Sequence, residues 1–322
     1  MRQSPTRRRA LTLLQLAFAA AVIAFAGRVL LRQWREVGRV SDVLRLDWLL
    51  VGASALLVLG SYAILIETWR MVLSRWDAHL DYWDAARVWT VSNLGKYVPG
   101  KVWQITAMGA MVHRRGISPI VAGASSVLIT LVNTVVGFVV VLALGARALD
   151  PAGKGTGAAV VAIVLLAAGL VAAPAILPLV ARALARVSGR SISLPRVPAS
   201  AVWIAAVGSA AAWTLYGIAF RLFVAGVTGS AAGATTEYVA VFTGSYLIGF
   251  VTLFSPGGLG TRELAMTAAL ASFGLATPPQ AALITVGSRL WLTVLELVPG
   301  LLFMAGQGAR RRLTPTPPDA SS

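Results

Sequence analysis

Long runs of apolar residues alternate with short polar stretches along the whole chain. Six of these runs approach or exceed the roughly 20 residues that an α-helix needs to cross the hydrocarbon core of a bilayer. They cover residues 10–31, 48–66, 117–145, 157–180, 201–226 and 282–305. This pattern predicts six full membrane spans in an all-α polytopic membrane protein.

Two further apolar stretches, residues 85–111 and 238–275, are each interrupted by a Pro-Gly dipeptide. Proline removes a backbone hydrogen-bond donor and drives the preceding residue towards extended geometry, so a helix ends there. Non-helical backbone at membrane depth is tolerated only where protein or a water-filled cavity satisfies it. We therefore predict two re-entrant hairpins, each returning to the side from which it entered. The alternative is a pair of loops at the membrane surface, whose cations snorkel to lipid phosphates.

The composition supports membrane embedding. Hydrophobic residues make up 57% of the 322 positions and charged residues 12%, whereas a soluble domain carries about 25% charged residues. The spans use most of the chain, so we expect one membrane domain over residues 1–308 and no separate soluble catalytic domain. Residues 309–322 are expected to be a disordered, basic and Pro-rich cytoplasmic tail. The lack of cysteine excludes disulfides and thiol chemistry, and we expect no metal and no cofactor.

The net charge of +16 does not indicate a nucleic-acid partner. The basic residues occupy short loops and tails, a distribution typical of orientation signals and of contacts with anionic lipids. With a cytoplasmic N-terminus, 16 of the 28 Lys and Arg residues fall in inner segments and 7 in outer ones. We therefore expect a multi-pass protein of a bacterial-type cytoplasmic (inner) membrane, with both termini in the cytoplasm.

The N-terminal segment has two interpretations. The basic residues at 7–9 and the sequence Ala24-Phe25-Ala26 resemble a cleavable signal peptide. The apolar run continues to Leu31, however, which is long for a signal sequence and favours a retained first span. Residues 33–47 form either an outer loop or an amphipathic helix on the membrane surface.

The predicted elements divide into two halves, residues 10–145 and 157–305, and each half contains two spans, a hairpin and a third span. An odd number of crossings in each half inverts one half relative to the other, which gives a 3+3 inverted repeat. Pro99-Gly100 and Pro256-Gly257 occupy corresponding places. Inverted repeats with paired breaks near mid-membrane are a common construction of secondary carriers, and the breaks indicate the binding site.

The first break carries two cations beside a helix start. Lys96 and Lys101 flank it, and the free N–H groups of the helix that begins there favour a phosphate or another anion. The candidate binding residues of this segment are Asn93, Lys96, Tyr97, Pro99, Gly100, Lys101 and Gln104.

The second break is rich in glycine, which allows backbone to approach a ligand closely. Thr261 or Ser255 is expected to cap the helix that follows. Arg262 is suited to bind a phosphate or carboxylate with two hydrogen bonds, and Glu263 to balance its charge or to bind a coupling proton. The candidate binding residues of this segment are Ser255, Pro256, Gly257, Gly258, Gly260, Arg262 and Glu263.

Two more charges, Arg289 and Glu296, lie inside the last span. An isolated charge there costs at least about 2.5 kcal/mol, so each needs a partner or a cavity. Either they complete the binding site, or ion pairs of Arg289 with Glu296 and of Glu263 with Arg262 hold the bundle together.

Three motifs are similar to the lysylphosphatidylglycerol synthase transmembrane, or flippase-like, family. They are Asn93-x-x-Lys96-Tyr97-x-Pro99-Gly100-Lys101, Ser255-Pro256-Gly257-Gly258-x-Gly260-x-Arg262-Glu263, and Arg289 followed by Pro299-Gly300. Members carry this membrane domain alone or fused to domains that aminoacylate phosphatidylglycerol or transfer sugars to lipids. The resemblance implies a flippase-like role for the matching residues. It does not imply synthesis of lysylphosphatidylglycerol, because we recognise no aminoacyl transferase domain.

The leading hypothesis is a carrier, not an enzyme, that moves an anionic or lipid-linked head group across the membrane by alternating access. A first alternative is an integral-membrane glycosyl or head-group transferase, which needs positioned carboxylates or a metal. A second is a non-transporting partner of a lipid-modifying synthase or glycosyltransferase. The expected partners are therefore a membrane lipid or lipid-linked substrate, anionic lipids at the basic loops, and such a synthase.

Overall fold

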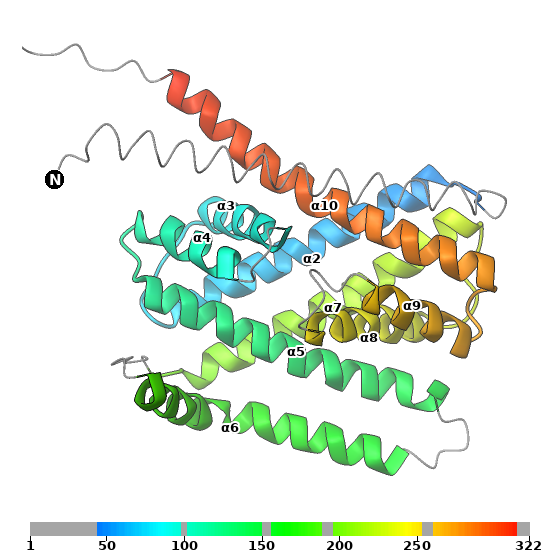
Figure 1. Ribbon diagram of the computed structural model, residues 1–322, viewed down its shortest axis with the longest axis horizontal. Coiled ribbons are helices and arrows are strands. Elements are labelled where there is room, and N and C mark those ends of the chain that lie inside the picture. The colour runs from blue at the N-terminus through cyan, green and yellow to red at the C-terminus, as the bar shows by residue number, and fades with distance from the viewer. Residues whose placement is uncertain (1–43, 98–101, 150–155, 189–195, 253–259, 314–322) are drawn as a thin grey trace, which may run out of the picture.

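The computed structural model describes residues 44–97, 102–149, 156–188, 196–252 and 260–313 (Figure 1). The regular elements of these ranges are helices, apart from an isolated β-bridge between Arg45 and Thr228. The structure therefore confirms an all-helical protein within the described part of the chain.

Five long helices are apolar enough to cross a membrane. They are α2 (Trp48–Ser74), α5 (Pro119–Leu149), α6 (Thr156–Ser188), α7 (Ala199–Thr228) and α10 (Pro278–Leu313). Their apolar portions contain 20 to 30 residues, and 20 helical residues extend about 30 Å. These helices match five of the six predicted spans; the sixth, residues 10–31, lies outside the described residues. Helix α10 continues past residue 308, where we expected the tail to begin.

Each Pro-Gly segment forms shorter helices on both sides of its break. The first contains α3 (Tyr82–Asn93), the 3₁₀ helix η2 (Leu94–Tyr97) and α4 (Val102–His113), and the second contains α8 (Thr235–Val251) and α9 (Thr261–Ser272). The breaks themselves, at 98–101 and 253–259, lie outside the described residues. Helices of 12 residues, such as α3, α4 and α9, extend about 18 Å, less than the hydrocarbon core.

Helices α2 and α7 form an antiparallel pair at the centre of the bundle. Glycines bring their backbones together: Gly226 faces Val51, Gly60 faces Leu215, and Gly208 faces Thr68. A Cβ at Gly208 would overlap the Thr68 side chain. At the start of α2, the backbone N–H groups of Arg45 and Asp47 each donate to carbonyls near the end of α7, both over 2.8 Å. The register is thus fixed by close backbone packing.

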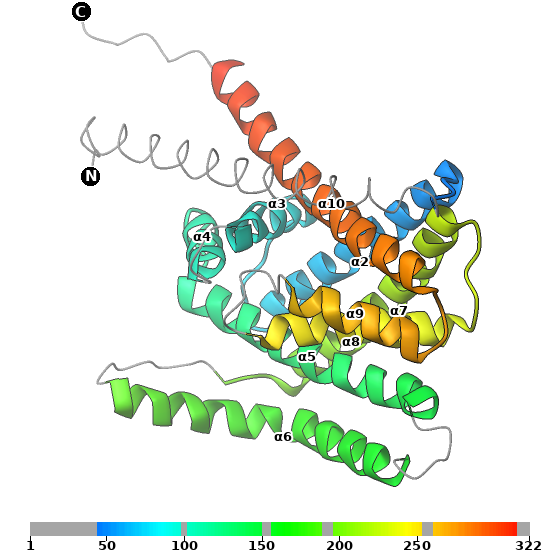
Figure 2. The same ribbon diagram turned by 45° about the vertical axis from the view of Figure 1, so that its right-hand side comes forward.

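Helices α8 and α9 turn back on each other beside α5. Gly145 of α5 lies against Ala240 near the start of α8 and against Phe273 directly after α9. The two outer ends of the pair therefore meet at one place (Figure 2). The pair of α3 and α4 is closed similarly, because Arg115, just beyond α4, forms an ion pair with Asp84 in the first turn of α3.

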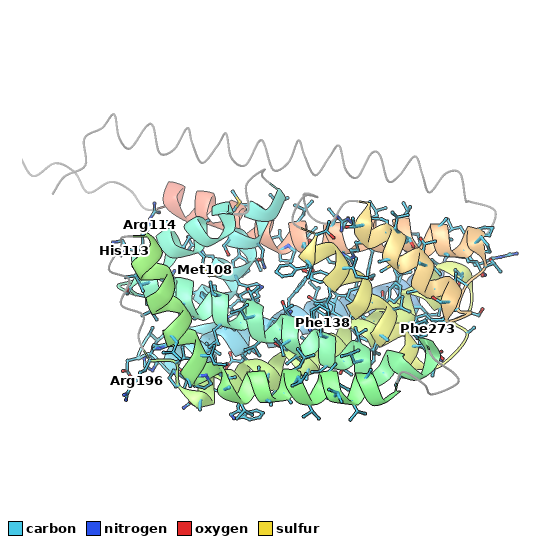
Figure 3. All side chains as sticks on the ribbon, turned by 60° about the horizontal axis from the view of Figure 1, so that its bottom comes forward. Met108, His113, Arg114, Phe138, Arg196 and Phe273 are labelled. Atoms are coloured by element: carbon cyan, nitrogen blue, oxygen red, sulfur yellow. The ribbon has the colours of Figure 1, made fainter. Side chains whose placement is uncertain are left out.

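The connecting loops gather at two opposite ends of the molecule. Figure 3 places His113, Arg114 and Arg196 at one end and Phe273 at the other. At the first end, Trp76 Nε1 donates to the Arg196 carbonyl over 2.8 Å, which joins the loops after α2 and before α7. The described loops predicted to be cytoplasmic thus share one end of the bundle.

Helix α6 lies at the edge of the bundle (Figure 1). It packs on α5 and α7, while Val161, Val164 and Leu165 point outwards and are exposed. An apolar helix with such a face is suited to contact lipid. The functional candidates lie on the other side, between α2, α7, α8, α9 and α10.

Candidate functional site

Two residues, Gly260 and Glu263, form the start of α9. Gly260 precedes the helix with a φ of 85°, a left-handed conformation that glycine adopts without strain. Its backbone N–H donates to Glu263 Oε2 over 2.7 Å. The expectation that Thr261 caps the helix is therefore wrong, because Thr261 is the first helical residue; Ser255 lies outside the described residues.

The other oxygen of Glu263 reaches the last span. Glu263 Oε1 lies 3.3 Å from Arg289 Nε, and the two side chains are 24% and 13% exposed. This pair differs from both predicted pairs, Arg289 with Glu296 and Glu263 with Arg262. The reason is that α9 packs beside α10, where the hydroxyls of Thr267 and Thr285 lie 3.1 Å apart. Glu263 is one turn before Thr267 on the same face.

Arg262 points away from this ion pair and into the bundle. Its side chain is 8% exposed, and its guanidinium carbon lies 5.6 Å from the centre of the Phe242 ring and 5.1 Å from that of Tyr246. Gly249 makes room for it, since a Cβ there would lie 2.8 Å from Arg262 Cβ. The guanidinium is thus held in a fixed place by cation–π contacts.

One hydrogen-bond donor of the Arg262 guanidinium is not satisfied by the described residues. Among the residues that the structure describes, its Nη2 atom is buried and has no hydrogen-bond partner. A buried, unsatisfied charged donor is costly. A ligand with an anionic oxygen would remove this cost, and a guanidinium matches phosphate or carboxylate geometry well.

A platform of aromatic rings supports Arg262. Tyr216 stacks on Phe242 with 5.5 Å between ring centres, and Tyr62 meets Tyr216 edge-on at 6.0 Å. Trp213 and Tyr246 form another edge-on pair at 5.4 Å. We call these five residues, from α2, α7 and α8, the aromatic platform. The motifs of the sequence do not predict this platform; the spacing of Trp213 with Tyr216 and of Phe242 with Tyr246 is the signal in the sequence that points to it.

Helix α10 brings the remaining charges to this place. Arg289 and Glu296 both act electrostatically on the buried Arg262 guanidinium. Further along α10, Gly300 lies against Leu94, the first residue of η2, with about 3.0 Å between a Cβ there and the Leu94 side chain. Both Pro-Gly segments therefore contact α10, on either side of Glu296 along the helix.

The predicted site residues divide into three groups. Arg262, Glu263, Arg289 and Glu296 lie together, with Gly260 at the helix start, and Asn93 ends α3. Lys96 and Tyr97 belong to η2 and Gln104 to α4, but their side chains lie outside the described part. The following lie entirely outside the described residues: Pro99, Gly100, Lys101, Ser255, Pro256, Gly257 and Gly258.

Comparison with known proteins identifies the family. No curated protein matches the chain. The family described as the lysylphosphatidylglycerol synthase TM region matches residues 12–300, which include both Pro-Gly segments, the aromatic platform and α10 up to Gly300. The chain is therefore a member of the lysylphosphatidylglycerol synthase TM region family, as its motifs predicted.

Proposed function

We propose that this protein is a flippase-like carrier that moves an anionic or lipid-linked head group across a membrane by alternating access. The observation that carries the proposal is Arg262: a guanidinium buried in the bundle, fixed on two rings, with a donor that no described residue satisfies. Membership of a membrane family related to lipid modification supports the choice of substrate class.

The proposal includes the two re-entrant hairpins and the inverted repeat. The three 12-residue helices α3, α4 and α9 support the hairpins, because about 18 Å of helix cannot cross the hydrocarbon core. The contacts between helices support the repeat. Helix α2 packs on α7. The contact of α5 with α8 corresponds to the contact of α10 with α3, and the contact of α4 with α5 corresponds to the contact of α9 with α10. Each of these relations pairs corresponding elements of the two halves, with α2 and α7 antiparallel.

In the proposed site, Arg262 binds an anionic oxygen of the head group. The ion pair of Glu263 with Arg289 fixes the start of α9, and Glu296 supplies a nearby negative charge. From the sequence alone, we propose Lys96 and Lys101, which belong to the other break, as further ligands of the same head group. A bound anion neutralises the buried Arg262 charge. The free-energy cost of carrying the anionic head group through the membrane is therefore lower when it is bound in the site.

We propose the cytoplasmic end of the molecule to be the one that contains Arg114, Arg115 and Arg196, with the termini on that side of an inner membrane. The positive-inside rule supports this orientation, because these basic residues occur in short connections close to the ends of the spans. Transport then needs no chemistry on the lipid. A separate synthase or glycosyltransferase would supply the modified lipid.

Flipping by purified protein tests the proposal. The full chain is reconstituted in liposomes containing acyl-labelled phosphatidylglycerol, and flipped lipid is scored by its protection from a membrane-impermeant quencher. We expect Arg262→Ala to slow flipping at least tenfold, and Arg262→Lys to retain part of the rate, because an ammonium lacks the planar donor pair.

The matched control is Arg221→Ala. Arg221 is also an arginine of a membrane helix, but it donates to Thr235 Oγ1 at the start of α8 and to the Gly233 carbonyl in the loop between α7 and α8. It should flip lipid at the wild-type rate. Unchanged flipping by correctly folded Arg262→Ala protein would refute the proposed function.

A further inference from the structure

An apolar groove separates α2 from α10. It has a volume of about 430 Å³ and is lined by Leu59 of α2 together with Leu295, Val298, Pro299, Leu302 and Phe303 of α10. Ligand pockets commonly have volumes of about 300–1,000 Å³. Within the described residues the groove is open to the outside of the bundle, since Val298 is 47% and Leu302 67% exposed.

Residues of the polar site follow the groove lining along both of its helices. Glu296 shares a face of α10 with Pro299 and Phe303, which follow it by three and seven residues. On α2, Tyr62 is one turn from Leu59 and contacts Tyr216 of the aromatic platform. The groove therefore has apolar walls, and its lining is followed along α10 by Glu296 and along α2 by Tyr62 of the platform that holds Arg262.

The corresponding interface of the other half is closed. Under the proposed inverted repeat, α5 and α7 correspond to α10 and α2. Between α5 and α7, Trp213 fills the space: its Nε1 donates to the Asn133 carbonyl over 3.0 Å. A Cβ on Gly137 of α5 would lie 3.1 Å from the same nitrogen. An opening on one side and packed side chains on the other are what an alternating-access carrier presents in one of its two states.

We infer that the groove between α2 and α10 is a lateral portal, which holds an acyl chain of the transported lipid while the head group occupies the Arg262 site. This inference rests on the proposed function and adds the place of the lipid tail to it. A lipid is favoured as occupant because it brings its own anionic oxygen to Arg262. An apolar helix docked in the groove would cover Val298 and Leu302 but leave that donor unmet.

Photolabelling of the full chain in liposomes tests the portal. The probe is phosphatidylglycerol with a diazirine near the end of one acyl chain, diluted into unlabelled zwitterionic lipid. We expect labelling of the α10 peptide around Leu302 to saturate at low probe fraction and to be competed by unlabelled phosphatidylglycerol. Leu165 on α6 is the matched reference, since it is also 67% exposed; its labelling should rise in proportion to the probe.

Two matched variants extend the test. Leu302→Trp fills the groove and should reduce both saturable labelling and flipping several-fold, whereas Leu165→Trp should change neither. Arg262→Ala should weaken the saturable labelling at Leu302 at least threefold, because the head group no longer holds the lipid there.

The outcomes separate the portal from the proposed function. Labelling at Leu302 that never saturates overturns the portal, while loss of flipping in Arg262→Ala still supports the carrier. Saturable labelling at Leu302 in a protein that does not flip lipid supports the binding of an acyl chain in the groove and overturns the proposed carrier function. The chain has no native cysteine, so a high-yield disulfide between Leu302→Cys and a cysteine placed within residues 10–31 would assign the groove to that segment and overturn the portal.

Discussion

At the scale of single residues, Glu263 connects two parts of the candidate site. One carboxylate oxygen accepts the Gly260 N–H over 2.7 Å, and the other faces Arg289 Nε at 3.3 Å. The side chain therefore fixes the start of α9 and its distance from α10 at the same time. Arg262, the next residue back, lies in the first turn of the same helix, and its guanidinium is held by the Phe242 and Tyr246 rings. On this basis we expect Glu263 to act as a positioning residue, while its role in binding a coupling proton stays a prediction that the following substitutions test.

Substitution of Glu263 can separate these roles. Glu263→Gln keeps an oxygen for the Gly260 N–H but loses the charge that faces Arg289, while Glu263→Ala loses both. Loss of a helix cap costs about 0.5–2 kcal/mol, so we expect Glu263→Ala to unfold at a lower temperature in detergent than Glu263→Gln. Flipping by Glu263→Gln should stay within a few-fold of wild type. Complete loss of flipping at an unchanged melting temperature would instead assign proton coupling to Glu263.

At the scale of elements, the position of α9 depends on its contacts with two neighbours. Twelve residues form an α-helix of marginal stability alone, and α9 is held by α8 on one side and α10 on the other. The contact with α8 needs Gly249, whose missing side chain leaves space for Arg262. The hairpin and the charged site are thus one packing unit.

Gly249→Ala should disturb this unit. The added methyl group would lie 2.8 Å from Arg262 Cβ, and overpacking of this kind costs about 1–3 kcal/mol. We expect a lower melting temperature together with slower flipping. Gly169→Ala on α6 is the control, because no described atom lies within 4 Å of its added Cβ, and alanine favours the helix. Equal behaviour of the two variants in both assays would show that Gly249 does not position Arg262.

At the scale of the whole molecule, the loops divide between two ends. Trp76 with Arg196, and Asp84 with Arg115, join loops at one end, whereas Arg45 and Asp47 meet the end of α7 at the other. A helical bundle with such separated ends fits a fixed orientation in a membrane. The proposed carrier requires that the first end faces the cytoplasm.

Single cysteines in this cysteine-free chain can measure the orientation. Arg114→Cys and Arg196→Cys should react with a membrane-impermeant maleimide in inside-out vesicles but not in intact cells. Ser230→Cys, which is exposed beyond the end of α7, should show the opposite pattern. Labelling of Arg114→Cys and Ser230→Cys from the same side would contradict the topology.

Within the described residues, the sequence predicted the long apolar helices but not the contacts between the helices. Apolar length predicts α2, α5, α6, α7 and α10, and the two prolines predict where the short helices end, because both depend on local chemistry. The partner of Glu263 depends on the register of α9 against α10, which the spacing within either helix does not contain. The aromatic platform was missed for the same reason: rings at helical spacing are also typical of ordinary packing between spans.

The glycine contacts between α2 and α7 have a mechanical consequence. Close backbone packing at Gly226, Gly60 and Gly208 keeps the two helices together as a pair, so that they can serve as the axis about which the two halves tilt. Under the proposed inverted repeat the two helices are equivalent, so tilting one half to separate α2 from α10 brings α5 towards α7, and the reverse tilt does the opposite. The two states then bury similar surfaces and differ little in free energy, as a carrier that must return after each cycle requires.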